Sequence, residues 1–332
     1  MKKHLFFALF VVITIAFPCV AQGQTMDELD IAIARANEAR TKAGDFESPA
    51  YFPSEWEAAE AQFTHAEAQK TLSAYNTAAD AFNALFDLTI PLYAQAREDE
   101  IMVLRDDLVH NGARNSFPDY FLPADQAALL AFDQYEARDF YTARDSAAKA
   151  LSMYEVLTSV YEAWLVRQEI RERDFASYDP DNFDRAGEII SEAMDAYETG
   201  DNAAALEKAE DAIVTYKLVL ANGWARYAEL RSSLAETGRQ TALNNKANIA
   251  ARDLFNEANA NYTAAAAIHD SRDYEEAAKQ FIHAEALFIT ASNTATEKRA
   301  FAAEAIEEAH KKIAESDETA RQAEIILRGG SK

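Results

Sequence analysis

Residues 200–216, GDNAAALEKAEDAIVTY, carry the pattern that decides the fold, because related segments recur three more times along the chain. After the Gly-Asp pair, Ala205, Ala209, Ala212 and Tyr216 follow one another in steps of four, three and four residues. These steps place the four side chains on one face of an α-helix. Because three of them are small, a second helix can approach closely. The segment therefore predicts a helix that packs along a seam of small residues.

The other three segments repeat this packing seam after a similar turn, at a period of about 62 to 72 residues. At two matched positions the packing seam contains Ala78 and Phe82, Ala143 and Ala147, Ala205 and Ala209, and Ala277 and Phe281. Internal periodicity of this kind indicates a helical repeat protein, in which each unit packs on its neighbours. We therefore expect an all-α chain of repeated helical units.

The turn and the helix that follows it resemble the second half of the tetratricopeptide repeat. In that family a Gly-Asp-Tyr turn opens the second helix, and Ala and Phe recur at these offsets. Residues 191–216 and 262–288 match best. The Trp, Leu and Gly of the family's first helix are not in register, and its period is about 34 residues. The resemblance covers half of each unit and implies an α-solenoid of helical hairpins with a concave binding surface.

Proline marks the expected start of three units, in the segments Tyr51–Glu55, Tyr120–Asp125 and Tyr178–Asp181. Proline suits the first helical turn, and the acid that follows it complements the helix dipole. Gly238 stands where a preceding helix should end. We expect a first helix over 26–43, and then helical pairs over 54–71 with 74–111, 123–138 with 140–173, 181–199 with 202–237, and 243–270 with 273–315.

The second helix of each pair is longer than an ordinary repeat helix. Each contains residues that favour a kink or a break, at Ile90-Pro91, Thr158-Ser159, Asn222-Gly223 and Ser292-Asn293-Thr294. We expect long, kinked second helices or a third helix in each unit. The predicted organisation is a signal peptide over 1–23, an N-terminal helix over 24–44, and one repeat domain over 45–327 with units 45–112, 113–174, 175–238 and 239–315, a C-terminal capping segment, and a frayed tail over 328–332.

The composition agrees with an all-α fold and argues against two classes of partner. Proline (7) and glycine (9) are scarce, which favours helix. The chain has 32 Lys and Arg against 56 Asp and Glu, a formal net charge of -24. So acidic a surface repels nucleic-acid phosphates and anionic lipid head groups. We expect neither nucleic acid nor an anionic membrane surface as a direct partner.

The first residues have the layout of a secretory signal peptide. Lys2 and Lys3 precede an apolar stretch from Leu5 to Phe17, and small residues follow. The stretch is shorter than the about 20 residues that span a bilayer, so cleavage after Ala21 or Gly23 is expected. The mature chain would then be periplasmic or secreted. Cys19, the only cysteine, leaves a lipid anchor open as an alternative, although small residues do not precede it.

No catalytic, cofactor or metal motif is complete, and we expect a non-enzymatic protein without cofactor or metal. Walker, GxGxxG and GxSxG sequences are missing. Ser146–Lys149 fits the SxxK pattern, but neither SDN nor KTG follows. The acidic run from Asp179 has Asp184 and Ile190 where a calcium loop needs glycine and glutamate. The histidines lack HxxxH and HExxH spacing.

Aromatic residues at matched turns are the candidate partner-binding residues: Phe52, Trp56, Tyr120, Phe121, Trp164, Tyr178 and Trp224. They either plug the joints between hairpins or line a concave binding surface. The leading hypothesis is an extracytoplasmic scaffold that holds a protein or peptide partner in the cell envelope. One alternative is a small-ligand or substrate-delivery component of a transporter, with an enclosed pocket. Another is an envelope glycan-active enzyme with two carboxylates about 5 to 9.5 Å apart.

Overall fold

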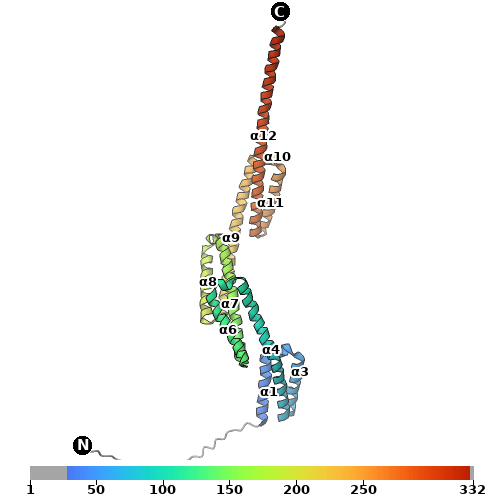
Figure 1. The fold of residues 1–332 in the computed structure, drawn as a ribbon, viewed down its shortest axis with the longest axis vertical. Coiled ribbons are helices and arrows are strands. Elements are labelled where there is room, and N and C mark those ends of the chain that lie inside the picture. Colours follow the sequence, from blue (N-terminus) through green and yellow to red (C-terminus); the bar gives the residue numbers. More distant parts are fainter. Residues whose placement is uncertain (1–27, 330–332) are drawn as a thin grey trace, which may run out of the picture. The chain divides into compact units, whose positions relative to one another are not determined.

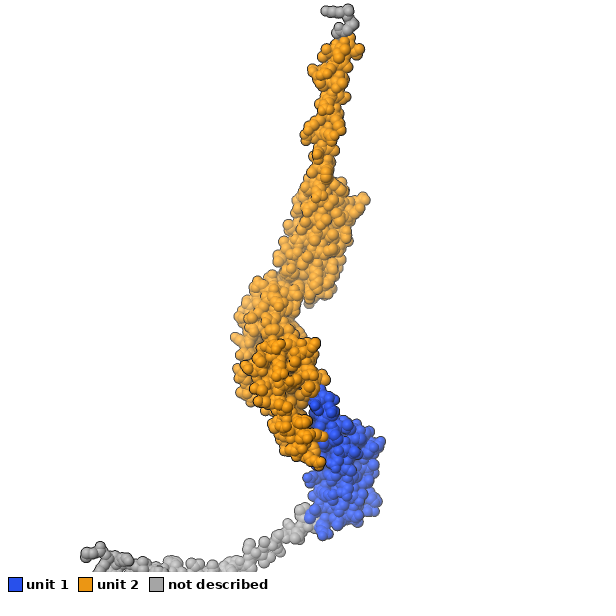
Figure 2. All heavy atoms as spheres, viewed as in Figure 1, with its two compact units in different colours: residues 1–100 blue, residues 101–332 orange. Residues whose placement is uncertain are grey.

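The computed structural model describes residues 28–329, which form helices and no strands (Figure 1). The predicted signal peptide with Cys19 and the last three residues of the chain lie outside this range. The described residues fall into two compact units, divided between residues 100 and 101 (Figure 2). The prediction of an all-α fold is confirmed for the described part of the chain.

The first unit contains α1 (Glu28–Asp45), α2 (Ser48–Tyr51), α3 (Pro53–Gln69) and most of α4 (Leu72–His110). The second unit contains the end of α4 and nine further elements. These are α5 (Ala113–Ser116), α6 (Pro118–Glu136), α7 (Phe140–Glu172), the 3-10 helix η1 (Phe175–Tyr178), α8 (Pro180–Thr199), α9 (Asn202–Asn244), α10 (Ala247–Ala250), α11 (Arg252–Asp270) and α12 (Tyr274–Gly329).

One joint recurs four times along these elements. A helix ends, one residue takes a left-handed conformation, a four-residue helix follows, and one residue with φ between −149° and −132° and ψ between 44° and 66° leads into the next helix. The left-handed residues are Glu47, Gly112, Asp174 and Lys246, with φ of 64°, 86°, 58° and 59°. The helices after the joint begin at Pro53, Pro118, Pro180 and Arg252. Proline fits this position because its missing N–H would have no helical partner there.

Two predicted helix starts are wrong, because the joints place these starts at other residues. In the second copy the helix begins at Pro118, and Pro123, which we expected at the start, lies inside α6. In the fourth copy α9 runs through Gly238 to Asn244, so the helix expected over 243–270 is divided into α10 and α11. The fourth joint has Arg252 in place of proline and keeps the same backbone conformation. The joint therefore does not require proline.

The turn that precedes each long helix also recurs. Its left-handed residues are Lys70, Arg138, Gly200 and Arg272. In the third copy the side chain of Asp201 accepts a hydrogen bond from the backbone N–H of Ala204 at 3.1 Å, which caps α9. Asp273 accepts one from Glu276 at 3.3 Å in the fourth. The Gly-Asp pattern thus lies at the start of a helix, as predicted.

Each long helix continues through its expected weak point, so the prediction of a third helix in each unit is wrong. Pro91 lies inside α4 although it removes one helical hydrogen bond. Contacts hold the helix on both sides of it. Thr89 hydrogen-bonds to Ser48 at 2.8 Å, and the ring of Tyr93 lies 5.2 Å from that of Phe46. Thr158-Ser159, Gly223 and Asn293 likewise lie within α7, α9 and α12.

The long helices make the described part of the chain a series of three-helix bundles. The first bundle is α1, α3 and the start of α4, which are joined by contacts of Arg35 with Asp80, Arg40 with Glu60, and Phe63 with Tyr75. The second is the end of α4 with α6 and the start of α7, the third is the end of α7 with α8 and the start of α9, and the fourth is the end of α9 with α11 and the start of α12. All eight predicted packing-seam residues are buried, none being more than 8% exposed.

Candidate functional site

The aromatic residues predicted as partner-binding lie separately in the joints. In the first unit, Phe52 is half-buried and the Trp56 ring meets the edge of Phe82 at 5.2 Å. In the third joint, Trp224 is 8% exposed and packs on Phe175 at 5.2 Å. Tyr178, in the same joint, is exposed. These four side chains do not form one surface.

The second joint holds the other three predicted aromatics. Phe121 is buried against Tyr154. Trp164 stacks on Tyr161 with ring centroids 5.6 Å apart. Tyr120 is half-buried, and its carbonyl oxygen accepts a hydrogen bond from the Tyr197 hydroxyl at 2.7 Å. With the exception of Tyr178, the predicted residues pack within the joints rather than stand free on the surface.

A polar contact that the sequence analysis did not identify recurs across the joints. Arg40, Arg105, Arg167 and Arg239 each stand seven residues before the left-handed residue of a joint. In three bundles the Nε–H of this arginine donates to a side chain 20 residues later, on the helix after the joint. The acceptors are Glu60 at 2.6 Å, Asp125 at 2.8 Å and Asn259 at 2.9 Å. We call this contact the cross-joint pair.

The second bundle adds a tyrosine to its cross-joint pair. The Tyr154 hydroxyl donates to Asp125 Oδ1 at 2.5 Å, and Arg114 lies 3.4 Å from Oδ2. Burial alone would raise the pKa of the Asp125 carboxyl, but the hydrogen bonds from Tyr154 and Arg105 and the charges of Arg105 and Arg114 outweigh it and lower that pKa. Burial and the same carboxylate raise the pKa of Tyr154. Asp125 is therefore an ionised acceptor and not a proton donor at neutral pH.

The third bundle has the arginine and the tyrosine but not the acid. Gly187 stands 20 residues after Arg167, where Asp125 stands in the second bundle. Tyr216 matches Tyr154, since each lies sixteen residues after the left-handed residue of its turn. Arg167 Nε and the Tyr216 hydroxyl are both buried and have no hydrogen-bond partner among residues 28–329. Unpaired buried donors cost free energy, so this site differs from the other three.

The surroundings of Gly187 are positively charged. A Cβ added at Gly187 would lie 3.6 Å from the Tyr216 hydroxyl, an ordinary contact distance. The guanidinium groups of Arg167 and Arg171 lie 5.8 and 5.9 Å from the centre of the Phe183 ring. Burial raises the pKa of Tyr216; the charges of Arg167 and Arg171 lower it, and the charge of Asp184 adds a smaller upward effect. Within residues 28–329 neither arginine forms an ion pair. The site therefore offers unpaired donors of positive charge.

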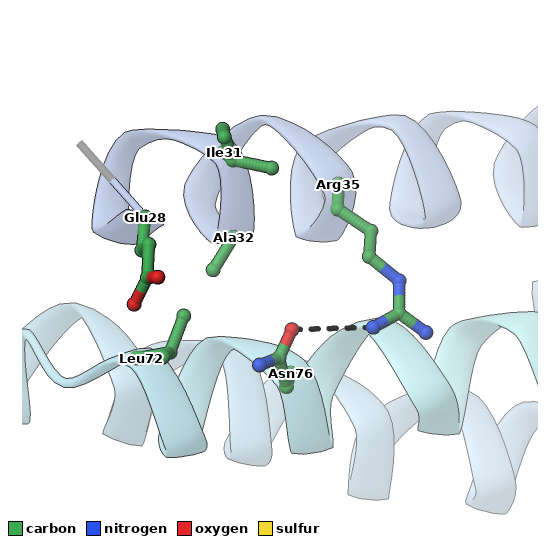
Figure 3. A pocket seen from close by; sticks show the side chains of 6 residues that line it. All are labelled: Glu28, Ile31, Ala32, Arg35, Leu72 and Asn76. Atoms are coloured by element: carbon green, nitrogen blue, oxygen red, sulfur yellow. Dashed lines mark hydrogen bonds between the residues drawn. The ribbon is translucent and has the colours of Figure 1, made fainter. Parts of the chain in front are cut away.

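A hollow of about 410 Å³ lies between α1 and α4 in the first unit (Figure 3). Glu28, Ile31, Ala32 and Arg35 line it from α1, and Leu72 and Asn76 line it from α4. Arg35 donates to Asn76 at 3.2 Å and to Asp80 at 2.6 Å. The hollow is open to solvent, since Ile31 and Leu72 are both exposed. Its only arginine is already paired, which makes it a weaker candidate than the third bundle.

The described residues show neither a membrane-spanning helix nor a metal-binding group of side chains. None of the helices between residues 28 and 329 has the length and apolar character needed to cross a membrane. The same residues contain no group of three or more His, Cys, Asp or Glu side chains placed to hold a metal ion. Comparison with protein-family models, curated proteins and solved structures finds no match to this chain.

Proposed function

We propose that this chain is a non-enzymatic, extracytoplasmic scaffold, an α-solenoid of helical hairpins similar to tetratricopeptide repeats, that binds a protein partner in the cell envelope. Support for the compartment comes from the signal-peptide layout of residues 1–23. Support for a solenoid comes from the joint and the cross-joint pair, which recur at matched positions.

The observation that carries a partner-binding role is the outer face of α6. Leu122, Leu129, Leu130 and Phe132 are between 50 and 64% exposed, within eleven consecutive residues. Single exposed apolar side chains are normal on a protein surface, but a cluster of this size marks an interaction site. The net charge of -24 favours a partner with a basic surface around its apolar contact. We therefore assign the partner to the outer face of α6.

The alternative of a small-ligand component requires an enclosed apolar pocket. The hollow between α1 and α4 is open, and Arg35 and Glu28 form part of its lining. An open hollow with charged side chains in its lining does not enclose an apolar ligand. Protein binding is therefore the function that the exposed surfaces support best.

The test uses site-specific photo-crosslinking in the cell envelope. A photoreactive residue at Leu129 should give one discrete adduct, and Phe132→Glu should reduce its yield about tenfold or more, as for an interface hot spot. The same probe at Val214 of α9, which is 68% exposed, is the matched control and should give none. Equal labelling at Leu129 and Val214, or an adduct that Phe132→Glu does not change, would contradict the assignment.

A further inference from the structure

We propose that the third bundle binds a carboxylate group from outside the chain, between Arg167, Gly187 and Tyr216. In the second bundle the Asp125 carboxylate accepts hydrogen bonds from Arg105 Nε at 2.8 Å and from the Tyr154 hydroxyl at 2.5 Å. The third bundle keeps both donors and has glycine in place of the acid. An external carboxylate in that place would satisfy both donors.

The chemistry of the donors selects a carboxylate. A guanidinium group and a hydroxyl both donate to it, and hydrogen bonds that involve ionised groups are the strongest ones in proteins. Arg171 adds a second positive charge near the Phe183 ring. In a chain with 56 acidic residues, two neighbouring arginines without an ion pair are a further sign that the acceptor comes from elsewhere.

Size and access are also suitable. Gly187 and Arg167 are half-buried and Arg171 is exposed, so the site communicates with solvent. A Cβ built at Gly187 meets only the Tyr216 hydroxyl within 4 Å, at 3.6 Å, and the acceptor in the second bundle is an aspartate side chain, which is one methylene and one carboxylate. Acetate has the same two parts. The ligand is therefore either a small free carboxylate or an acidic side chain of another protein, and the two sources share this chemistry.

The experiment measures the thermal unfolding temperature of the mature chain with acetate or chloride at equal ionic strength. Acetate should raise the unfolding temperature, and neither Tyr216→Phe nor Arg167→Gln should show this response. Gly187→Asp should raise the unfolding temperature by about 2 to 4 °C above that of Gly187→Ala and should remove the acetate response. Gly187→Ala is the control without an acceptor, and it is a stringent one, because alanine gains more helix propensity over glycine than aspartate does.

A second probe, aspartate blocked at both ends, separates the two sources. A response to acetate alone indicates a small free carboxylate, and a response to both probes indicates an acidic side chain of a protein. The proposal is overturned if neither probe has an effect and Gly187→Asp is no more stable than Gly187→Ala. This site does not depend on the outer face of α6, so either proposal can fail alone.

An independent observation concerns the second half of α12, which continues beyond α10 and α11 (Figure 1). Every residue from 301 to 328 is exposed. Apolar and small residues recur there in alternating steps of four and three: Ala302, Ile306, Ala309, Ile313, Ser316, Ala320, Ala323 and Leu327. This spacing is typical of one strand of a coiled coil. We call these eight residues the open seam.

The open seam continues the face of α12 that is buried against the other helices of the fourth bundle. Phe281, Phe288 and Ala295 precede it at the same spacing and are at most 1% exposed. Lys298 and Arg299 donate to the carbonyl oxygens of Ala250 and Asn245, at 2.7 and 2.6 Å, where the covered part ends. Most helices in water depend on tertiary packing for their stability. The open seam therefore has the same need for a neighbour as the part before it.

We infer that the open seam pairs with that of a second copy of this chain, as an antiparallel two-stranded coiled coil. In the symmetric register, Ala302 faces the partner's Leu327, Ile306 faces the partner's Ala323, and Ile313 faces the partner's Ser316. Three of the four layers in this register join one large and one small side chain, and the fourth places Ala309 on the partner's Ala320, where the helices can approach closely. His310 comes beside the partner's Asp317, and the overlap from residue 302 to residue 327 comprises 26 residues and is about 38 Å long.

A parallel arrangement fits less well. It would place Ile306 on Ile306 and Ala309 on Ala309, so large and small layers would alternate. It would also place the fourth bundles of the two copies side by side near residue 299. At that point α10 and the end of α9 already lie against this face of α12. In the antiparallel arrangement the two sets of bundles lie at opposite ends of the pair.

Sedimentation of the mature chain tests this pairing. The chain should sediment as a dimer, and Ile313→Glu should weaken the association at least tenfold. Ile325→Glu changes the same residue type on the opposite side of the helix, where Ile325 is 62% exposed, and should leave the dimer intact. For orientation, Ala309→Cys and Ala320→Cys chains in a Cys19→Ser background should crosslink when mixed. A monomer at every concentration, or equal effects of the two glutamate variants, would overturn the pairing.

Discussion

The two halves of α12 repeat the same spacing of small and apolar residues, yet one half is covered and the other is not. From Ala277 to Ala295 the seam lies against α9, α10 and α11. From residue 301 to residue 328, every side chain is exposed. The comparison shows that spacing identifies the helix face that can be buried. Whether that face is buried depends on the neighbours that the rest of the chain, or another chain, supplies.

The largest effect is expected from two phenylalanines of this one helix. Phe288 is fully buried, with Phe255 at 5.6 Å, whereas Phe301 is 72% exposed. Phe288→Ala should lower the free energy of unfolding by about 3 to 5 kcal/mol, since it leaves a cavity. Phe301→Ala should change it by less than about 0.5 kcal/mol. Urea unfolding of both variants measures the free energy of unfolding. Similar losses of this free energy in the two variants would contradict the difference between the two halves of α12.

A smaller effect is expected at the end of α4, where Arg105 forms a half-buried charge pair with Asp125 of α6. Asp125→Ala leaves Arg105 and the Tyr154 hydroxyl without their acceptor, and should cost about 2 to 4 kcal/mol. The pKa of Asp125 is lowered in the folded state. Its contribution is therefore present above the unfolded pKa of about 3.9 and is lost as the pH falls through the lower folded value.

The pH dependence gives this prediction a second readout. The stability difference between the wild type and Asp125→Ala should be constant near neutral pH and should narrow below about pH 4. Denaturant unfolding at several pH values measures it. A difference that stays the same down to pH 2 would mean that the carboxylate charge does not contribute.

The smallest effect is expected from substitutions of two glycines of α9. An added Cβ would clash with a neighbouring side chain at Gly223 and would have enough space at Gly238. A Cβ at Gly223 would lie 2.3 Å from Cδ2 of Phe175, a ring fixed between Trp224 and Tyr227. Gly223→Ala should therefore cost about 1 to 3 kcal/mol through overpacking. A Cβ at Gly238 would meet Phe288 at 3.5 Å, so Gly238→Ala should stabilise α9 by about 0.5 to 1 kcal/mol. Thermal unfolding, followed by the loss of helix content, should give a lower unfolding temperature for Gly223→Ala and a higher one for Gly238→Ala. A shift in the same direction for both variants would contradict the packing at the third joint.

Local physics explains which parts of the fold could be predicted from the sequence. The Gly-Asp turn at Gly200, the starts of the long helices and the small residues of the packing seam depend on contacts within a few turns of helix. The start of α6 was wrong because Pro118 and Pro123 both precede an acid, and matching Tyr120-Phe121 to Tyr51-Phe52 selected the second. Four-residue helices such as α10 are too short to give a periodic signal.

The cross-joint pair could not be recognised in the same way. Its arginine and its acceptor are 20 residues apart and lie on different helices, so their spacing has no meaning until the joint between them is known. With the joints aligned, the sequence does contain the signal, because Gly187 stands where the other three bundles have the acceptor of the arginine. The exposure of the open seam has no local cause at all, since it depends on the partner of α12.

The long helices that neighbouring bundles share have a mechanical consequence. α9 contributes its start to the third bundle and its end to the fourth, without an interruption between Asn202 and Asn244. A pulling force along this part of the chain would pass through continuous helical backbone instead of a slack linker. Stretching should then release the third and fourth bundles together in one extension step, rather than one after the other.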